Sequence, residues 1–196
     1  MFDRLIVITA PEFFGEEAEI LNQLFEAGLK RLHLRKPQGR KEELEKLIME
    51  IGPGFRKFIA VHYHQELAVE MNLGGMHFSY HTNSNPADIT DRYTVSCSLH
   101  SWNELEEVQQ KIDYCFMSPV FNSISKVRYL ANEALQEVPS FALNVFALGG
   151  ISEANCVEVL DKQYSGVAVL GALWDDPSQA LLRFKVLRNK VNAHVN

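Results

Sequence analysis

The stretch "RLIVITAPEFFGEEAEILNQLFEAG" (4–28) decides the fold, because it contains one complete β/α unit. Its first residues, "RLIVIT" (4–9), form a short apolar run typical of a buried strand. In the second part, the apolar residues at positions 20, 21, 24 and 25 fall on one face of a helix. A strand followed by a helix is the repeating element of sheets with parallel strands.

The same unit recurs along the chain. Seven further strand-like runs lie at residues 30–35, 57–61, 75–78, 93–98, 114–118, 144–148 and 166–170. Helical patterns follow most of them, including residues 129–138, but the polar connection after 75–78 is poor in helix signals. Eight such units can close into a barrel. We therefore expect an α/β fold: a small (β/α)8 TIM barrel with a weak or missing helix after the fourth strand. An open doubly wound sheet is the alternative.

Composition narrows the classes of function. The 196 residues are 46% hydrophobic, and no shift in composition marks a boundary, so we expect one domain over residues 1–196. The net charge of −6 comes without any basic block, which argues against nucleic acid as a partner. Apolar runs are too short to span a membrane, and the start lacks a signal-peptide pattern. The three cysteines show no CxxC spacing, which argues against a disulfide framework. A cytoplasmic protein is expected.

A phosphate site is predicted at the carboxyl ends of the last strands, where such barrels often hold phosphate. Glycines follow the seventh and eighth expected strands, and their backbone N–H groups can approach an anion closely. The loop "SPVFNSISK" (118–126) adds hydroxyls and a cation after the sixth. Plain turns are the alternative explanation for each loop alone. The predicted phosphate cradle consists of Ser123, Ser125, Lys126, Gly149, Gly150 and Gly171.

Other polar residues also follow expected strands. His33 and Arg35 are two apart, so both point to one face of the second strand, and Arg35 could hold a second anion. After the fifth strand come Ser98 and His100, and histidine is the residue type best suited to proton transfer near neutral pH. The alternatives are a charge at the barrel rim and an incidental histidine. Together with His62, these residues are the candidate substrate contacts, and His100 is the candidate catalytic residue.

Histidines at positions 62, 64, 77 and 81 raise the question of a metal site. No carboxylate or cysteine lies at ligand spacing with them, so we expect polar residues of the barrel mouth and no bound metal.

The motifs "HLRK", "GGMHF", "SCSLHS", "DYCFMSPVFNSISK", "ALGGI" and "GVAVLGAL" resemble the thiamine phosphate synthase family and its TenI-type relatives, the thiazole tautomerases. The resemblance covers essentially the whole chain, and "DYCFMSPVFNSISK" is its most specific part. It implies a (β/α)8 barrel, a homo-oligomer, and thiazole phosphate bound by the last two loops with a pyrimidine partner near strands two to five. The resemblance places the family's residues on Ser123, Ser125, Lys126, Gly149, Gly150, Arg35, Ser98 and His100.

The departures from the family pattern concern its magnesium ligands. The resemblance places two aspartates where this chain has His62-Tyr63 and Thr82, and Pro37 stands where the family has a lysine. Histidine, tyrosine and threonine are poor substitutes for carboxylates on Mg²⁺.

Three hypotheses follow for the reaction. The first is a metal-independent thiazole tautomerase with His100 as the proton carrier and no cofactor. The second is a thiamine phosphate synthase that uses Mg²⁺ through a displaced carboxylate such as Glu66 or Asp88. The third is a non-catalytic binder of thiazole phosphate or thiamine phosphate with a regulatory role.

Overall fold

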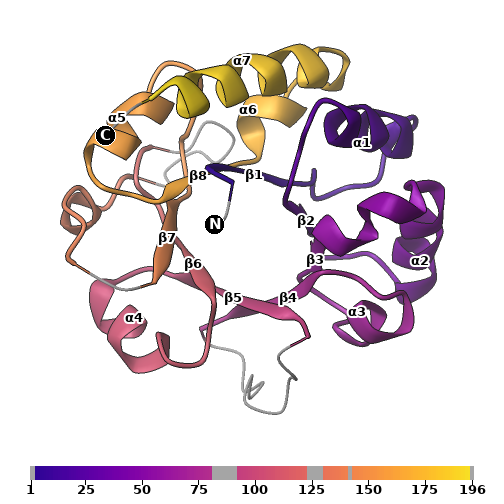
Figure 1. The fold of residues 1–196 in the computed structure, drawn as a ribbon, viewed down its shortest axis with the longest axis horizontal. Coiled ribbons are helices and arrows are strands. Elements are labelled where there is room, and N and C mark those ends of the chain that lie inside the picture. The colour runs from indigo at the N-terminus through magenta and orange to yellow at the C-terminus, as the bar shows by residue number, and fades with distance from the viewer. Residues whose placement is uncertain (1–2, 81–91, 123–129, 141–142, 195–196) are drawn as a thin grey trace.

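A closed barrel of eight parallel strands forms the centre of the protein (Figure 1). The computed structural model describes residues 3–80, 92–122, 130–140 and 143–194. Each strand pairs with the next along the chain, and the last pairs with the first, so the predicted TIM barrel is confirmed and the open sheet is excluded. The strands are β1 (Leu5–Ile8), β2 (Leu32–Leu34), β3 (Ile59–Val61), β4 (Gly75–Ser79), β5 (Thr94–Leu99), β6 (Tyr114–Met117), β7 (Asn144–Ala147) and β8 (Gly166–Val169).

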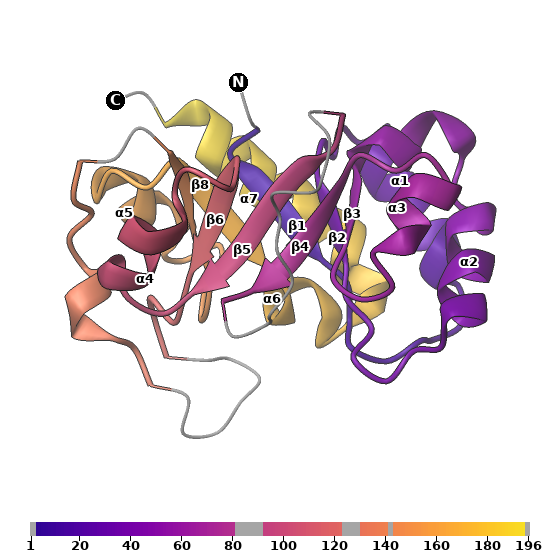
Figure 2. The ribbon, with the colours of Figure 1, turned by 90° about the horizontal axis from the view of Figure 1, so that it is seen from below.

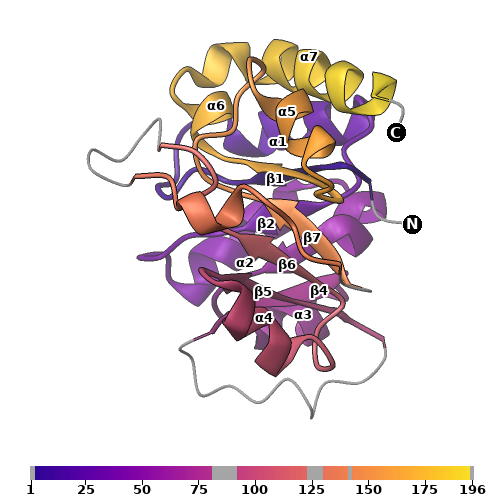
Figure 3. The same ribbon diagram turned by 90° about the vertical axis from the view of Figure 1, so that its left-hand side faces the viewer.

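The helices form the outer layer of the barrel. They are α1 (Glu17–Glu26), α2 (Lys41–Glu50), α3 (Glu66–Glu70), α4 (Trp102–Val108), α5 (Cys156–Asp161), α6 (Gly171–Trp174) and α7 (Ala180–Ala193), with 3-10 turns at Pro53–Phe58, Glu133–Leu135 and Pro177–Gln179. Helices α5, α6 and α7 cover the side of β8 and β1 (Figure 3). None of the helices in the described ranges is long and apolar enough to cross a membrane.

The helices expected after β4 and after β6 have different outcomes. The weak helix expected after β4 falls on residues 81–91, outside the described residues. The helix expected over 129–138 is wrong for the described part, which contains only the 3-10 turn Glu133–Leu135. Asn132 caps this turn by accepting from the Ala134 N–H, and Pro139 disfavours helical backbone at the residue before it. Between Asn132 and Pro139, the chain therefore forms a single 3-10 turn.

Side chains on successive strand residues alternate between two cores. On β1, Leu5 and Val7 pack in the large core between strands and helices, whereas Ile6 and Ile8 belong to a second cluster. This inner cluster fills part of the barrel interior, and its buried members are Ile6, Ile8, Tyr114, Phe116, Phe146 and Ala168. The interior is therefore packed, as is usual for this fold.

The carboxyl ends of the strands define the rim at which function is expected. Figure 2 shows the arrowheads of β4 and β5 and helix α6 at the same rim. At the opposite end, Arg4 before β1 links the barrel to the end of α7, since its Nη1 donates to the His194 carbonyl at 2.8 Å. We refer to the functional rim as the barrel mouth.

Candidate functional site

The glycine turn after β7 contacts the loop after β6, as the predicted cradle requires. Gly149 and Gly150 have φ values of +96° and +67°, a backbone conformation that L side chains rarely adopt. A Cβ on Gly150 would lie 2.2 Å from the Asn122 carbonyl oxygen, and one on Gly149 would lie 2.9 Å from Pro119 Cα. The Phe121 N–H donates to the Gly149 carbonyl at 3.1 Å. Glycine is therefore needed for the close approach of two loop backbones.

The rest of the cradle is only partly described. Gly171 is the first residue of α6, directly after β8, and β8 is the neighbour of β7 in the barrel. Ser123, Ser125 and Lys126 lie outside the described residues. The glycines thus lie at the mouth, and the phosphate cradle that they would form with the three side chains stays a prediction.

His100 lies at the mouth, one residue after the end of β5, and its side chain is exposed. Its Nδ1 lies 2.8 Å from the Ser118 carbonyl oxygen, so Nδ1–H must be the donor. Its backbone N–H donates to the Glu104 carboxylate at 2.7 Å. These contacts fix the ring against the start of the β6 loop. Within the described part of the chain Nε2 has no hydrogen-bond partner, so this nitrogen can exchange a proton.

Three imidazole rings meet inside the barrel on strands β2 to β4. His33 comes from β2, His77 from β4, and His62 directly follows β3. His33 Nδ1 lies 2.9 Å from His62 Nε2, and the His62 and His77 rings stack with centroids 4.0 Å apart. His33 and His77 are 0% and 3% exposed, and His62 is half-buried. We call these three residues the imidazole cluster.

Hydroxyl groups lie at hydrogen-bond distance from three further nitrogens of the cluster, those of His33 and His77. His33 Nε2 lies 2.7 Å from Tyr114 Oη. His77 Nδ1 and Nε2 each lie 2.8 Å from a serine hydroxyl, those of Ser96 and Ser98 respectively. Ser98, predicted as a substrate contact, is therefore a neighbour of His77 at the half-buried edge of the cluster.

Burial keeps the three rings neutral. Desolvation lowers the pKa of His33 and of His62 well below the usual value of 6.5, with the neighbouring histidines adding to the effect. For His77, desolvation and then the charge of Arg35 lower the pKa to about 3. At neutral pH each ring therefore has one N–H group and one lone pair.

Arg35 and Lys36 follow β2 but point to opposite sides. Arg35 is half-buried and its charge acts on His62 and His77, so it lies beside the cluster, and its predicted role in holding an anion stays a prediction. Lys36 is 0% exposed, and its Nζ contacts both carboxylate oxygens of Glu17, at 2.6 and 2.8 Å. The sequence analysis missed this ion pair, although alternation along an extended segment would send adjacent cations to opposite faces.

The donor atoms found here do not fit Mg²⁺. At the ligand positions implied by the resemblance, His62 belongs to the cluster and Tyr63 is 38% exposed, while Thr82 and Asp88 lie outside the described residues. Glu66 pairs with Lys41 and His64, away from the cluster. Among described residues, the one group of three metal-capable side chains is the imidazole cluster. Mg²⁺ requires oxygen ligands, and imidazole suits other metals.

Of the two other histidines of the proposed metal pattern, His64 does not join the cluster, since its Nε2 lies 3.1 Å from the Gly39 carbonyl oxygen. His81 lies outside the described residues. His33, in contrast, was absent from that pattern. The closed barrel brings it next to His62, because β2 and β3 are paired strands.

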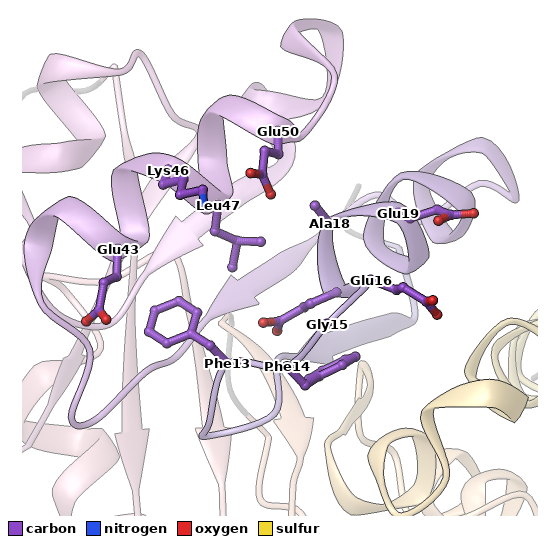
Figure 4. A pocket seen from close by; sticks show the side chains of 11 residues that line it. Phe13, Phe14, Gly15, Glu16, Ala18, Glu19, Glu43, Lys46, Leu47 and Glu50 are labelled. Atoms are coloured by element: carbon purple, nitrogen blue, oxygen red, sulfur yellow. The ribbon is translucent and has the colours of Figure 1, made fainter.

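A separate hollow of about 540 Å³ lies between α1 and α2 (Figure 4). It is lined by Phe13, Phe14 and the start of α1, with Glu43, Lys46, Leu47 and Glu50 from α2. None of the predicted site residues lines it, and its carboxylates outnumber its single cation. An acidic lining disfavours phosphate, so this hollow does not compete with the barrel mouth.

Comparison with known proteins gives consistent results. The family model described as thiamine monophosphate synthase (TMP-TENI) matches residues 5–173. The structure of a thiamine phosphate pyrophosphorylase from Bacteroides thetaiotaomicron is 35% identical, with a TM-score of 0.83, over 98% of this chain and 100% of that one. A thiamine-phosphate synthase of Archaeoglobus fulgidus is 26% identical over 88% of this chain and 87% of its own length. One from Listeria welshimeri is 32% identical, but the match spans only 55% of this chain and 56% of that relative.

The match to the family model covers most of the chain, and the resemblance inferred from the motifs is confirmed. This chain belongs to the thiamine monophosphate synthase and TenI family of thiamine biosynthesis enzymes.

Proposed function

We propose that this protein is a thiamine-phosphate synthase, which joins thiazole phosphate to hydroxymethylpyrimidine diphosphate and releases pyrophosphate. The main support is the likeness, over the full length of both chains, to a protein described as a thiamine phosphate pyrophosphorylase. The names of the curated relatives agree with this. They favour the synthase over the tautomerase that the departures from the family motifs suggested.

In this reaction, a bond forms between the thiazole nitrogen and the methylene carbon of the pyrimidine. The bond from that carbon to the diphosphate oxygen breaks, and its electron pair leaves with pyrophosphate. The negative charge that develops on the leaving group needs a cation held in place beforehand. Arg35, half-buried at the mouth beside the imidazole cluster, is suited to this role because guanidinium binds phosphate oxygens in a bidentate fork.

The thiazole phosphate is assigned to the other side of the mouth. The glycine turn Gly149-Gly150, against the β6 loop, offers backbone N–H groups there, and Ser123, Ser125 and Lys126 would supply side-chain donors. Holding the two substrates by separate anions orients the reacting atoms toward each other. No step is assigned to Mg²⁺, because the described donor set does not fit that ion.

The test is an assay of purified protein with both substrates, measuring thiamine phosphate and pyrophosphate in equal amounts. Replacing Arg35 with glutamine should lower turnover by roughly 10²–10³-fold, the range for losing one stabilising donor in a transition state. Arg40→Gln is the matched control, because Arg40 is exposed on the outer layer and pairs with Glu43. If no thiamine phosphate forms, whichever divalent ion is added to the assay, the synthase assignment is contradicted.

The second candidate is the thiazole tautomerase, which the unsuitable donor set for Mg²⁺ and the position of His100 favour. With Nδ1 held by the Ser118 carbonyl, Nε2 of His100 could both accept and donate the proton that the tautomerisation moves. Replacing His100 with asparagine should then abolish most turnover of the thiazole tautomer and leave phosphate-ligand affinity nearly unchanged. Full tautomerase activity of His100→Asn would exclude this role. Ligand binding without either reaction would instead support a regulatory binder.

A further inference from the structure

We propose that the imidazole cluster is a binding site for a late first-row divalent metal ion of the Zn²⁺ class, bound by one nitrogen each of His33, His62 and His77. The inference does not depend on which reaction the protein catalyses. It replaces the expectation of polar rim residues with that of a metal site inside the barrel.

The geometry of the three rings is the first argument. One nitrogen of each ring lies within 4.8 Å of a nitrogen of both others, and the His33–His62 separation is 2.9 Å. A tetrahedral ion with metal–nitrogen distances of about 2.0–2.1 Å requires nitrogens roughly 3.3 Å apart. The observed separations bracket that value. Small side-chain rotations would therefore bring the three nitrogens to ligand distance.

The contacts around the rings are the second argument. Histidine ligands of metals usually donate the N–H of their other nitrogen to an oxygen, which fixes the ring and its tautomer. Tyr114 Oη lies 2.7 Å from Nε2 of His33, and the Ser96 hydroxyl lies 2.8 Å from Nδ1 of His77. Ser96 is itself 3.4 Å from the Met76 carbonyl, to which its O–H can donate while its oxygen accepts from His77. His33 is thus oriented in the way that a metal ligand needs. His77 would be so oriented once its Nε2 exchanged the Ser98 hydroxyl, 2.8 Å away, for the metal.

The chemistry of the donors selects the class of metal. Three neutral imidazoles suit Zn²⁺, Co²⁺ or Ni²⁺, whereas Mg²⁺ and Ca²⁺ require oxygen ligands. Three protein ligands also leave a fourth position for water or a ligand, as in catalytic zinc sites. The side chains of His62 and Ser98 are half-buried, so the fourth coordination position would be reached from their side of the cluster.

The competing explanation is a metal-free polar core, in which the short His33–His62 and His33–Tyr114 contacts are ordinary hydrogen bonds. The two explanations differ in a measurable way. A hydrogen-bonded core has no affinity for metal, and a metal site binds one ion per chain with the spectrum of nitrogen ligands.

The experiment uses the full chain without any affinity tag, stripped with chelator and titrated with Co²⁺. We expect visible d–d bands that saturate at one ion per chain, are bleached by equimolar Zn²⁺, and are unaffected by excess Mg²⁺. His62→Gln should weaken Co²⁺ binding at least 10-fold. This variant is preferred because His62 is half-buried, and circular dichroism verifies that it folds. His194→Gln, which changes a histidine paired with Asp161 outside the cluster, is the matched control and should bind like the wild type.

A second measurement keeps the test decisive if substitutions in the cluster reduce stability. Added Zn²⁺ should raise the melting temperature of the wild type and of His194→Gln, since a ligand that binds the folded state stabilises it. The rise should be lost in His62→Gln and in His77→Gln. Absence of saturable Co²⁺ bands in the folded wild type, or binding that persists unchanged in His62→Gln, would overturn the proposal.

Discussion

The two halves of the barrel interior are built from different chemistry. Strands β6, β7, β8 and β1 contribute the inner apolar cluster, in which Ile6, Phe116 and Phe146 are fully buried. Strands β2 to β5 contribute the imidazole cluster and the hydroxyls of Ser96 and Ser98. The same backbone arrangement thus encloses an apolar half and a polar half.

The difference shows how such a barrel divides stability and function. The apolar half is stabilised by burial, which needs no specific partner and hardly depends on pH. The polar half is stable only while each buried nitrogen has its hydrogen bond and each ring stays neutral. Proton and metal concentrations should therefore act mainly on the polar half, which contacts the apolar half where His33 meets Tyr114. The glycine turn that is part of the predicted phosphate cradle follows β7, in the apolar half.

The largest expected effect is a loss of stability in acid. In the folded protein the pKa of each clustered histidine lies below 6.5, while an unfolded histidine protonates near that value. Stability is therefore full above about pH 6.5 and falls as pH decreases toward the folded pKa. Between pH 7 and 5, His77, with a folded pKa of about 3, contributes about 2 kcal/mol of loss, and His33 and His62 add to the loss in the same direction.

The measurement is urea unfolding of metal-free protein across this pH range. His62→Gln should make the pH dependence clearly shallower, because the pKa of His62 is lowered by burial and glutamine does not titrate. His194→Gln should retain the wild-type dependence. Equal slopes for wild type and His62→Gln would show that the cluster does not control stability in acid.

The second largest effect is expected from a substitution in the inner apolar cluster. Phe146 is 0% exposed at the centre of the inner cluster, so Phe146→Ala should cost about 3–5 kcal/mol of unfolding free energy. Because no titratable group is removed, the cost should be the same at pH 7 and pH 6. Phe13→Ala is the control, since Phe13 is 38% exposed and should cost far less. A pH-dependent cost for Phe146→Ala would mean that the two halves are coupled.

The smallest effect concerns ligand binding at the phosphate cradle. Lys126→Ala should weaken binding of thiazole phosphate by about 1.5–3 kcal/mol, the range for losing a hydrogen bond to a charged group. Lys190→Ala is the control, because Lys190 is exposed on α7 and donates to the Glu153 carbonyl. Calorimetric titration of both variants measures the difference. Unchanged affinity of Lys126→Ala would remove this lysine from the cradle.

Local patterns determined much of this architecture. Eight apolar runs separated by mostly helical segments predict the barrel, because strands that alternate with helices must lie parallel with helices outside. The barrel rule then places Gly149, Gly150, Arg35 and His100 at the mouth, where the structure has them. Only position relative to a strand end was needed for these residues.

The imidazole cluster and the buried Lys36–Glu17 pair were decided by tertiary structure alone. In the sequence, His33, His62 and His77 are separated by 28 and 14 residues, and nothing local indicates that their rings converge. Closure of the barrel pairs β2 with β3 and β3 with β4, and it removes the rings from water. That removal sets their pKa values and their capacity to bind a metal, because both depend on burial and on neighbouring atoms rather than on spacing along the chain.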